Sequence, residues 1–400
     1  MAWTNPRHTL GAGSILLLVS CTPADTNLAP AEPAAGPEFQ HVIAAGEEGS
    51  FAGWPANNGS AAWTWANELL IGFSWAPFEE KDGHNLVIPE DRVVSSLLAR
   101  SLDGGATWTM EDPEGYVGDG GDPTDSPGGI DFTSPGFVFR VEGRGYLASN
   151  RERSVFFFSL DRGKTWQGPH SFGDLFDHPD LEGRELTPRT DYVVVSPDEL
   201  LVFLSARDPE HSRSDKVFVA RTVDSGQTFT FYSWVVPWGD PHRAVMPATV
   251  RVSDTKLVTA IRRRTMDPGD GWVDAYVSED AGASWSFLSR VGETGGSNGN
   301  PPGLVRLADG RLFCVYGNRD RRQMVGRFSQ DDGATWGPEL VLRDDYHADS
   351  FDDADLGYPR VTQRADGKLV ATYYWATEER PHHHIAATIW APEDVAPPEK

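Results

Sequence analysis

The sequence contains few cysteines and no long apolar segment, and both shortages narrow the class of protein. Only two cysteines occur in the 400 residues. Cys314 lies in the apolar run RLFCVY and is expected to be a small buried residue. The apolar stretch near the N-terminus, SILLLVS, is far too short to span a bilayer. No long segment repeats apolar residues with the 3.6-residue period of a helix, so the pattern does not favour a helical fold.

Positive charge is also scarce. The chain has 35 basic against 59 acidic residues, which gives a formal net charge of −24. A field of this sign repels nucleic acid and anionic membrane surfaces, so neither is an expected partner. The acidic excess is instead typical of a highly soluble surface.

Several motifs of cofactor and metal chemistry are missing. There is no Gly-rich phosphate loop between a strand and a helix, and no Ser-His-Asp nucleophile elbow. The acidic stretch DDYHADSFDDADLG lacks EF-hand spacing and is expected to be a loop over a channel mouth. His382–His384 cannot form one metal site if they lie on a strand, because adjacent side chains point to opposite faces, so we expect a solvated start of a strand. We therefore predict no cofactor and no metal.

The N-terminus is typical of an exported protein. Residues 1–21 have the pattern of a signal peptide, with Arg7 and His8 before the short apolar stretch. The phrase Leu-Val-Ser-Cys resembles a bacterial lipobox, which predicts lipidation of Cys21. Residues 22–38 are rich in Pro and Ala and are expected to be a disordered linker. The folded domain is then 39–400, and the lipid anchor is the expected membrane contact.

An eight-residue phrase recurs five times and organises the rest of the chain. Its consensus is Ser/Thr-x-Asp-x-Gly-x-Thr/Ser-aromatic, and successive copies begin 58, 63, 56 and 51 residues apart. The copies are Ser101–Trp108, Ser159–Trp166, Thr222–Phe229, Ser278–Trp285 and Ser329–Trp336. A fixed phrase at such a period indicates a repeat architecture.

The phrase has the composition of a hairpin turn between two outer strands. Its Asp can accept backbone N–H groups, its Gly provides a position with positive φ, and its aromatic residue can fold back under the turn. Strand-like runs around each copy, including one near Tyr146–Ser149, predict an all-β, six-bladed β-propeller. The sixth blade is one strand short, and the run at 39–46 is predicted to close it.

Arginines gather where the channel mouth of such a propeller is expected. Loops and inner-strand starts there contain Arg189, Asp191, Asn57 and several further arginines. Guanidinium groups bind carboxylates and sulfates through paired hydrogen bonds, so the set indicates a ligand with an anionic group.

Two longer segments resemble the bacterial sialidase (neuraminidase) superfamily, whose propellers carry the same Asp-box phrase. LGYPRVTQRADGKLVATYY resembles the segment with the nucleophilic tyrosine, which implies that role for Tyr358. TVRVSDTKLVTAIR resembles the segment that ends in the second arginine of the sialidase triad, here Arg262. NRDRRQMVGRFSQDDGATW resembles the segment of the third arginine, with Arg321 as the closest match and Arg319 or Arg322 as alternatives.

The resemblance has three departures. The first arginine is replaced within Gly53-Trp54-Pro55, the activating glutamate by Met246, and the glutamate that braces the first arginine by Tyr374. Trp54 would suit stacking on a sugar face, and Asp191 or His84 would have to replace the missing base. The general acid is matched to Asp91, with Glu90, Asp82 and His84 as rivals.

The sequence therefore predicts an exported, exo-acting glycoside hydrolase that acts on an anionic terminal sugar. Tyr358 would be nucleophile or stabiliser, Asp91 or His84 the proton donor, and Arg262, Arg189 and Arg321 the anion-binding group. Two alternatives remain open. One is a hydrolase or lyase on another acidic glycan, uronate or sulfated, and the other is a non-catalytic glycan-binding lipoprotein.

Overall fold

The computed structural model describes residues 37–55, 62–78, 95–116, 122–142, 154–211, 213–266, 269–296, 298–347 and 354–392, with the backbone alone at 188–190. Within these ranges the chain forms strands joined by turns, with a short 3-10 helix, η2 (Gly173–Asp177). A search of the described helices finds none with the length and hydropathy needed to cross a bilayer. The predicted signal peptide, its Cys21 and the linker up to residue 36 lie outside the described residues, so these predictions stay untested.

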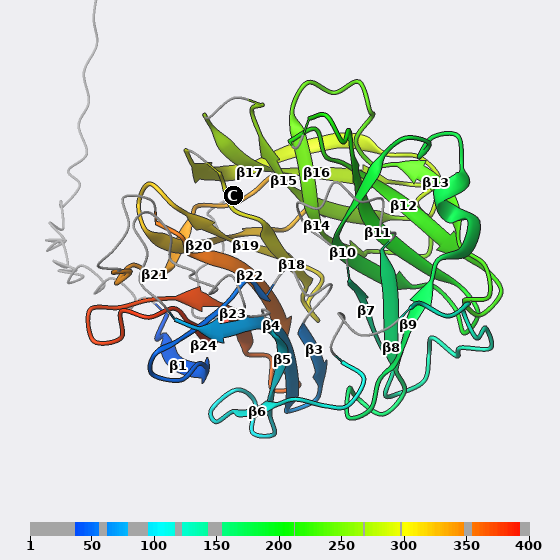
Figure 1. Ribbon diagram of the computed structural model, residues 1–400. Helices are drawn as coiled ribbons and strands as arrows, with labels where there is room; N and C mark the ends of the chain where they lie inside the picture. Colours follow the sequence, from blue (N-terminus) through cyan, green and yellow to red (C-terminus); the bar gives the residue numbers. More distant parts are fainter. Residues whose placement is uncertain are drawn as a thin grey trace, which may run out of the picture. The chain divides into compact units, whose positions relative to one another are not determined.

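Six antiparallel sheets follow one another in chain order, which confirms the predicted six-bladed β-propeller (Figure 1). Blade one contains β2 (Ser50–Gly53), β3 (Ala62–Trp65), β4 (Glu68–Pro77), β5 (Ser95–Ser101) and β6 (Thr109–Glu111). Blade two contains β7 (Val138–Glu142), β8 (Val155–Ser159) and β9 (Gln167–Ser171). Blade three contains β10 (Glu185–Val194), β11 (Leu200–Arg207), β12 (Lys216–Thr222) and β13 (Thr230–Trp234).

The other three blades each have four paired strands. Blade four contains β14 (Arg243–Arg251), β15 (Leu257–Arg264), β16 (Gly271–Ser278) and β17 (Ser286–Gly295). Blade five contains β18 (Pro302–Arg306), β19 (Leu312–Asn318), β20 (Gln323–Ser329) and β21 (Leu340–Arg343). Blade six contains β22 (Gly357–Gln363), β23 (Leu369–Trp375), β24 (His384–Trp390) and β1 (Gln40–Ala45).

The N-terminal strand closes the last blade, as predicted. β1 pairs antiparallel with β24, from Gln40 opposite Ile389 to Ala45 opposite Ile385, in a sheet of order β1-β24-β23-β22. This pairing covers the edge of β24 that would otherwise be open. It also ties the first described residues to the last ones.

The core lies between the blades, which explains why the middle strands are apolar on both faces. Every residue of β11, β19 and β23 is buried. One face of each such strand packs on the preceding blade and the other on the following blade, so the strict alternation of a half-exposed strand is absent. The innermost strands also contact one another, in the order β7, β10, β14, β18, β22 and β3.

One strand predicted for blade two, near Tyr146–Ser149, lies outside the described residues and stays a prediction. Within the described residues β7 pairs with β8, Val138 opposite Ser159. In blade one the sequence missed β3, which pairs with β4 beyond the end of β2.

The five Asp boxes form the predicted hairpin turns. In the first, Asp103 Oδ1 accepts the backbone N–H of Thr107 at 2.9 Å, and Thr107 Oγ1 donates to Oδ2 at 2.6 Å. These hydrogen bonds lower the pKa of Asp103 to about 2. The sequence predicts positive φ at the Gly alone, whereas the residue before it also has positive φ, as at Ala281 (56°) before Gly282 (91°).

Each box also docks on the blade that precedes it. In four boxes the acceptor is a backbone carbonyl of the turn and the donor lies in the preceding blade. The pairs are Arg364 Nη1 to Gly104 O at 2.7 Å, Ile130 N to Ser225 O at 3.0 Å, Ser233 Oγ to Gly282 O at 2.6 Å and Ser289 Oγ to Gly333 O at 2.5 Å. The boxes therefore join neighbouring blades as well as turning the chain within one blade.

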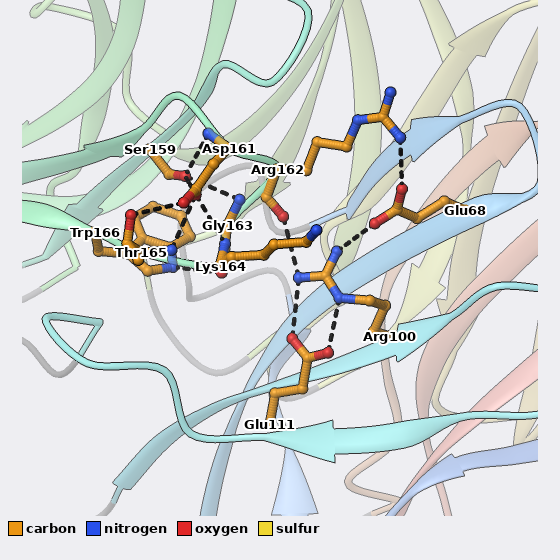
Figure 2. A network of polar contacts seen from close by, with 10 residues as sticks. All are labelled: Glu68, Arg100, Glu111, Ser159, Asp161, Arg162, Gly163, Lys164, Thr165 and Trp166. Carbon is orange, nitrogen blue, oxygen red and sulfur yellow. Dashed lines mark hydrogen bonds and ion pairs between the residues drawn. The ribbon is translucent and has the colours of Figure 1, made fainter.

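The second box has the most extensive docking contact, shown in Figure 2. Arg100 of blade one donates to the carbonyl of Arg162 at 3.0 Å, and Arg162 reaches back to Glu68 at 2.7 Å. Glu68 also pairs with Arg100 at 2.6 Å, and Glu111 accepts from Arg100 Nε at 2.7 Å. Arg100 is 8% exposed, so its charge depends on these two carboxylates.

We expect Glu68→Gln to destabilise the protein by about 1–3 kcal/mol, because it removes one carboxylate from a mostly buried arginine and breaks the link to Arg162. Urea unfolding measures the change. Asp254→Asn is the matched control, since the Asp254 side chain is 99% exposed in its pair with Arg251; its effect should stay within about 0.5 kcal/mol. Equal effects of the two variants would contradict a stabilising role for the contact between blades.

Candidate functional site

Strained backbone marks one region at the inner strands. Trp54, Met246 and Tyr358 have φ values of 51°, 60° and 49°, which non-glycine residues adopt at a cost of about 1–2 kcal/mol. Met246 lies where the β14–β15 register shifts and Tyr358 where the β22–β23 register shifts. Met246 and Tyr358 are buried in one apolar cluster, and Trp54 packs against it. Such strain, shared by three blades at one place, is typical of a functional site.

Arg262 and Tyr358, two of the predicted site residues, meet at this place. Arg262 is 3% exposed, and its Nη1 donates to Tyr358 Oη at 3.1 Å. The same nitrogen lies 3.5 Å from Met246 Sδ, and Nε donates to the carbonyl of Asn298 at 3.1 Å. The guanidinium carbon lies 5.6 Å from the centre of the Tyr358 ring. A buried cation therefore faces the phenol oxygen.

Arg319 forms the second part of the site together with Asp355 and Tyr374. Arg319 Nη2 pairs with Asp355 Oδ1 at 2.8 Å, and Tyr374 Oη donates to the same oxygen. Burial acts to raise the pKa of Asp355, but the charge of Arg319 and these hydrogen bonds hold it below its usual value. The nearby Asp355, Tyr374 and Tyr358 in turn raise the pKa of Arg319 against the effect of its burial. The pair is therefore charged at neutral pH.

The loop before β22 is held by Asn300. Asn300 is fully buried, accepts the backbone N–H of Tyr358 at 3.0 Å and donates to the carbonyl of Leu356 at 2.6 Å. Gly357 between them has a φ of 100°, and a Cβ there would lie 2.4 Å from Asn300 Oδ1. The close approach requires glycine, and it sets the direction of the Tyr358 side chain.

The histidine triplet differs from the prediction of a solvated start of a strand. His383 and His384 are each 2% exposed. His383 Nε2 lies 2.7 Å from the carbonyl of Asp355 and 3.0 Å from Tyr346 Oη, and its ring packs against Tyr374. Burial lowers the pKa of His383, so the neutral imidazole supports the Asp355 backbone. The sequence around His383 could not indicate this burial, because its partners Asp355 and Tyr346 come from a distant loop.

Other predicted site residues are placed differently. Arg321 is 46% exposed in its side chain and pairs with Glu339 at 2.5 Å, at the side of blade five. Asp191 accepts the backbone N–H groups of Tyr192 at 2.9 Å and Thr249 at 2.5 Å, so its carboxylate joins β10 to β14. Trp54, in contrast, stays beside the cluster of Met246 and Tyr358, where it packs on Phe51 with ring centres 4.9 Å apart.

The remaining predictions cannot be placed. Asp91, His84, Asn57, Glu90 and Asp82 lie outside the described residues, and the side chain of Arg189 is likewise not described. A hollow lined by Phe172, Leu175, His178 and Phe231 lies between η2 and β13, and none of the predicted site residues borders it. In the described part of the chain, no group of three or more His, Cys, Asp or Glu side chains is arranged to hold a metal ion.

The sequence missed Asp355 and the role of Tyr374. Asp355 lies in the acidic stretch that was expected to cover the channel mouth, directly before the segment with Tyr358. Tyr374 stands where the resemblance expects a glutamate, and its hydroxyl binds the carboxylate of Asp355. A carboxylate is thus present beside Tyr374, but it comes from a different part of the chain.

The family relationship agrees with this architecture. The BNR repeat-like domain family matches residues 137–370, more than half of the chain, and the chain belongs to this family. A comparison with curated proteins found no match.

Solved structures share the fold at low sequence identity. A protein of unknown function from Dyadobacter fermentans has a TM-score of 0.65 at 22% identity over 88% of this chain and 99% of that chain. A Hadza microbial sialidase has a TM-score of 0.58 at 17% identity over 86% and 66%. An α-L-arabinanase from Penicillium chrysogenum, solved with arabinobiose, has a TM-score of 0.56 at 12% identity over 89% and 99%. At these identities the likeness establishes the fold alone.

Proposed function

We propose that the protein is a glycoside hydrolase that removes a terminal sugar carrying a carboxylate or another anionic group. The observation that carries the proposal is the buried contact between Arg262 Nη1 and Tyr358 Oη at 3.1 Å, with Arg319 also close enough to Tyr358 to interact with it electrostatically. The likeness to a sialidase fold supports the same reaction class. The export and lipid anchor predicted from the N-terminus belong to the same proposal.

Cations around a tyrosine make it a better nucleophile. A phenol with a pKa of about 10 is mostly protonated at neutral pH, and nearby guanidinium charges stabilise the phenolate that attacks. In the proposed reaction, the Tyr358 phenol gives up its proton to solvent water, and Oη then forms a bond to the anomeric carbon while the glycosidic bond breaks. A proton donor, predicted as Asp91 or His84, protonates the departing oxygen. Water then releases the sugar from the tyrosine.

The anion would be bound by Arg262 and Arg319. The structure favours Arg319 over Arg321 for this role, because Arg319 is 8% exposed and lies beside Tyr358 and Tyr374, whereas Arg321 faces Glu339. Asp355 holds the Arg319 guanidinium in place through its 2.8 Å contact. Arg189 stays a predicted third member.

A second candidate is glycan binding without turnover, or cleavage of a different acidic glycan. Met246 favours it, because its side chain contacts Arg262 at the position where the resemblance expects the activating glutamate. Trp54 also favours it, because it replaces an arginine of the carboxylate clamp. If the protein cleaves a different acidic glycan, a base other than the residue at position 246 must take part in that cleavage.

A substrate panel tests the proposal. We expect the protein to release the fluorophore from an α-sialoside or a uronide faster than from a neutral α-L-arabinofuranoside at equal concentration. A second assay uses uronate polysaccharides as substrates and measures the absorbance of unsaturated products, which only a lyase would form. Preference for the arabinofuranoside would overturn the anionic substrate, and saturable glycan binding with no product in any assay would favour the binding protein.

A further inference from the structure

Two arginines on β15 point toward the same side of the site. Arg262 and Arg264 are two residues apart on a strand, so their side chains share a face. Both donate to Asn298, Arg262 to its backbone carbonyl and Arg264 to its side-chain oxygen. Arg263 between them points the other way, where Asp240 pairs with it at 2.6 Å.

Arg264 differs from Arg263 and Arg243 in having no carboxylate partner within the described residues. It is 2% exposed, and none of the ion pairs in this part of the chain includes it. Its Nε has no hydrogen-bond partner there either. By contrast, Arg243 pairs with the buried Asp215 at 2.6 Å. A buried guanidinium with a single neutral acceptor is costly, because its charge has lost water without gaining an anion.

Like charges surround Arg264. Arg243 is its direct partner in the β14–β15 register. Burial and the charges of Arg213, Arg243, Arg262 and Arg319 lower the pKa of Arg264 to about 10. Identical charges opposite each other on paired strands are destabilising. A positive potential of this kind, beside the Arg262–Tyr358 contact, is complementary to an anion.

We propose that Arg264 is the centre of a second anion-binding position, next to Arg262, which takes a sulfate or a second carboxylate on the same glycan. This inference rests on the proposed function in one respect, namely that the ligand is a glycan. It narrows the substrate class from a singly charged terminal sugar to one with two anionic groups, because Arg264 adds a further buried positive charge on the same face of β15 as Arg262.

Inorganic sulfate is the first probe, and thermal unfolding is the readout. We expect sodium sulfate to raise the melting temperature of the wild type in a saturable way, compared with sodium chloride at equal ionic strength. Arg264→Gln should weaken the saturable part at least tenfold in apparent Kd. Arg264→Lys should keep part of it, since the charge remains. A rise in melting temperature that does not saturate and is the same in all variants reflects the exclusion of sulfate from the protein surface.

Stability without sulfate gives an independent test. Arg264→Gln should melt at the wild-type temperature or higher, because it removes a buried charge that repels its neighbours. Arg243→Gln is the matched control on the paired strand, and it should melt several degrees lower because it removes the positive charge that pairs with the buried Asp215. If Arg264→Gln responds to sulfate as the wild type does, sulfate does not bind through Arg264 and the inference is overturned. If Arg264→Gln melts as low as Arg243→Gln, Arg264 has an anionic partner in the protein, which also overturns the inference.

The inference and the proposed function fail in different ways. The sulfate titration needs no turnover, so an inert protein that binds sulfate through Arg264 would remove the hydrolase and keep the anion position. Conversely, hydrolysis of singly charged and sulfated sialosides with the same kcat/KM in wild type and Arg264→Gln would keep the hydrolase and remove the second position. The expected result is at least a tenfold loss of preference for the sulfated substrate in Arg264→Gln.

Discussion

Replacing Tyr358 with Phe is expected to lower kcat/KM on an α-sialoside by about 10³-fold or more, because the substitution removes the oxygen that would bond to the anomeric carbon. The loss should appear in kcat rather than in KM. Arg262 keeps its contacts with Asn298 in the variant, and the Phe ring can still fill the apolar cluster that holds Tyr358. Steady-state release of the fluorophore measures both constants.

Tyr373→Phe is the matched control for this experiment. Tyr373 lies on β23 in the same blade, is fully buried and has a hydroxyl that bonds to Thr388 Oγ1. The control thus loses a buried hydroxyl of the same kind at a position outside the site, and we expect activity within about twofold of wild type once folding is matched by circular dichroism. If Tyr358→Phe keeps the wild-type kcat while both variants fold, the tyrosine mechanism is wrong.

Met246→Glu is expected to raise kcat on the α-sialoside by about 10²-fold, which is the lower range for a positioned general base. Met246 is 1% exposed, and its sulfur lies 3.5 Å from Arg262 Nη1, the nitrogen that also contacts Tyr358 Oη at 3.1 Å. A glutamate there would bring a carboxylate within reach of both groups. The positive charge of Arg262 would offset the cost of burying it.

Met246→Gln is the control that separates the effect of a basic carboxylate from the effect of side-chain size. It places an amide of nearly the same size against Arg262 without a negative charge or a basic oxygen, so kcat should not rise. A gain shared by both variants would indicate better packing rather than proton transfer. A loss of activity in Met246→Glu alone would indicate that another residue already acts as the base and that the new carboxylate neutralises Arg262.

The scaffold was predictable because its signals are local. Each Asp box combines a turn aspartate, a glycine with positive φ and an aromatic residue within eight residues, and the five copies mark five of the six blades. The missing strand of the sixth blade also identified the closing segment, which pairs with β24. The docking of each turn on the preceding blade was not predictable, because its donors, such as Ser233 and Arg364, carry no signal in their own neighbourhood.

The site was predictable in part. Arg262 and Tyr358 were matched through long segments of resemblance, and the structure brings their side chains together across 96 residues of sequence. The third arginine was not resolved by the sequence, since Arg319, Arg321 and Arg322 follow one another in a turn where Arg322 has a φ of 55°. The course of that turn directs Arg319 to Asp355 and Arg321 to Glu339.

By itself the sequence determined the blade count and the closure of the propeller, and it singled out Arg262 and Tyr358, whose side chains are in contact. These depend on turn geometry and on patterns within short segments. Only the tertiary structure decided that Asp355 and Tyr374 hold Arg319, and that Arg264 is buried without a carboxylate in the described part of the chain. Electrostatic pairing of buried groups depends on the distances between side chains of different blades, and these distances cannot be read from the order of residues along the chain.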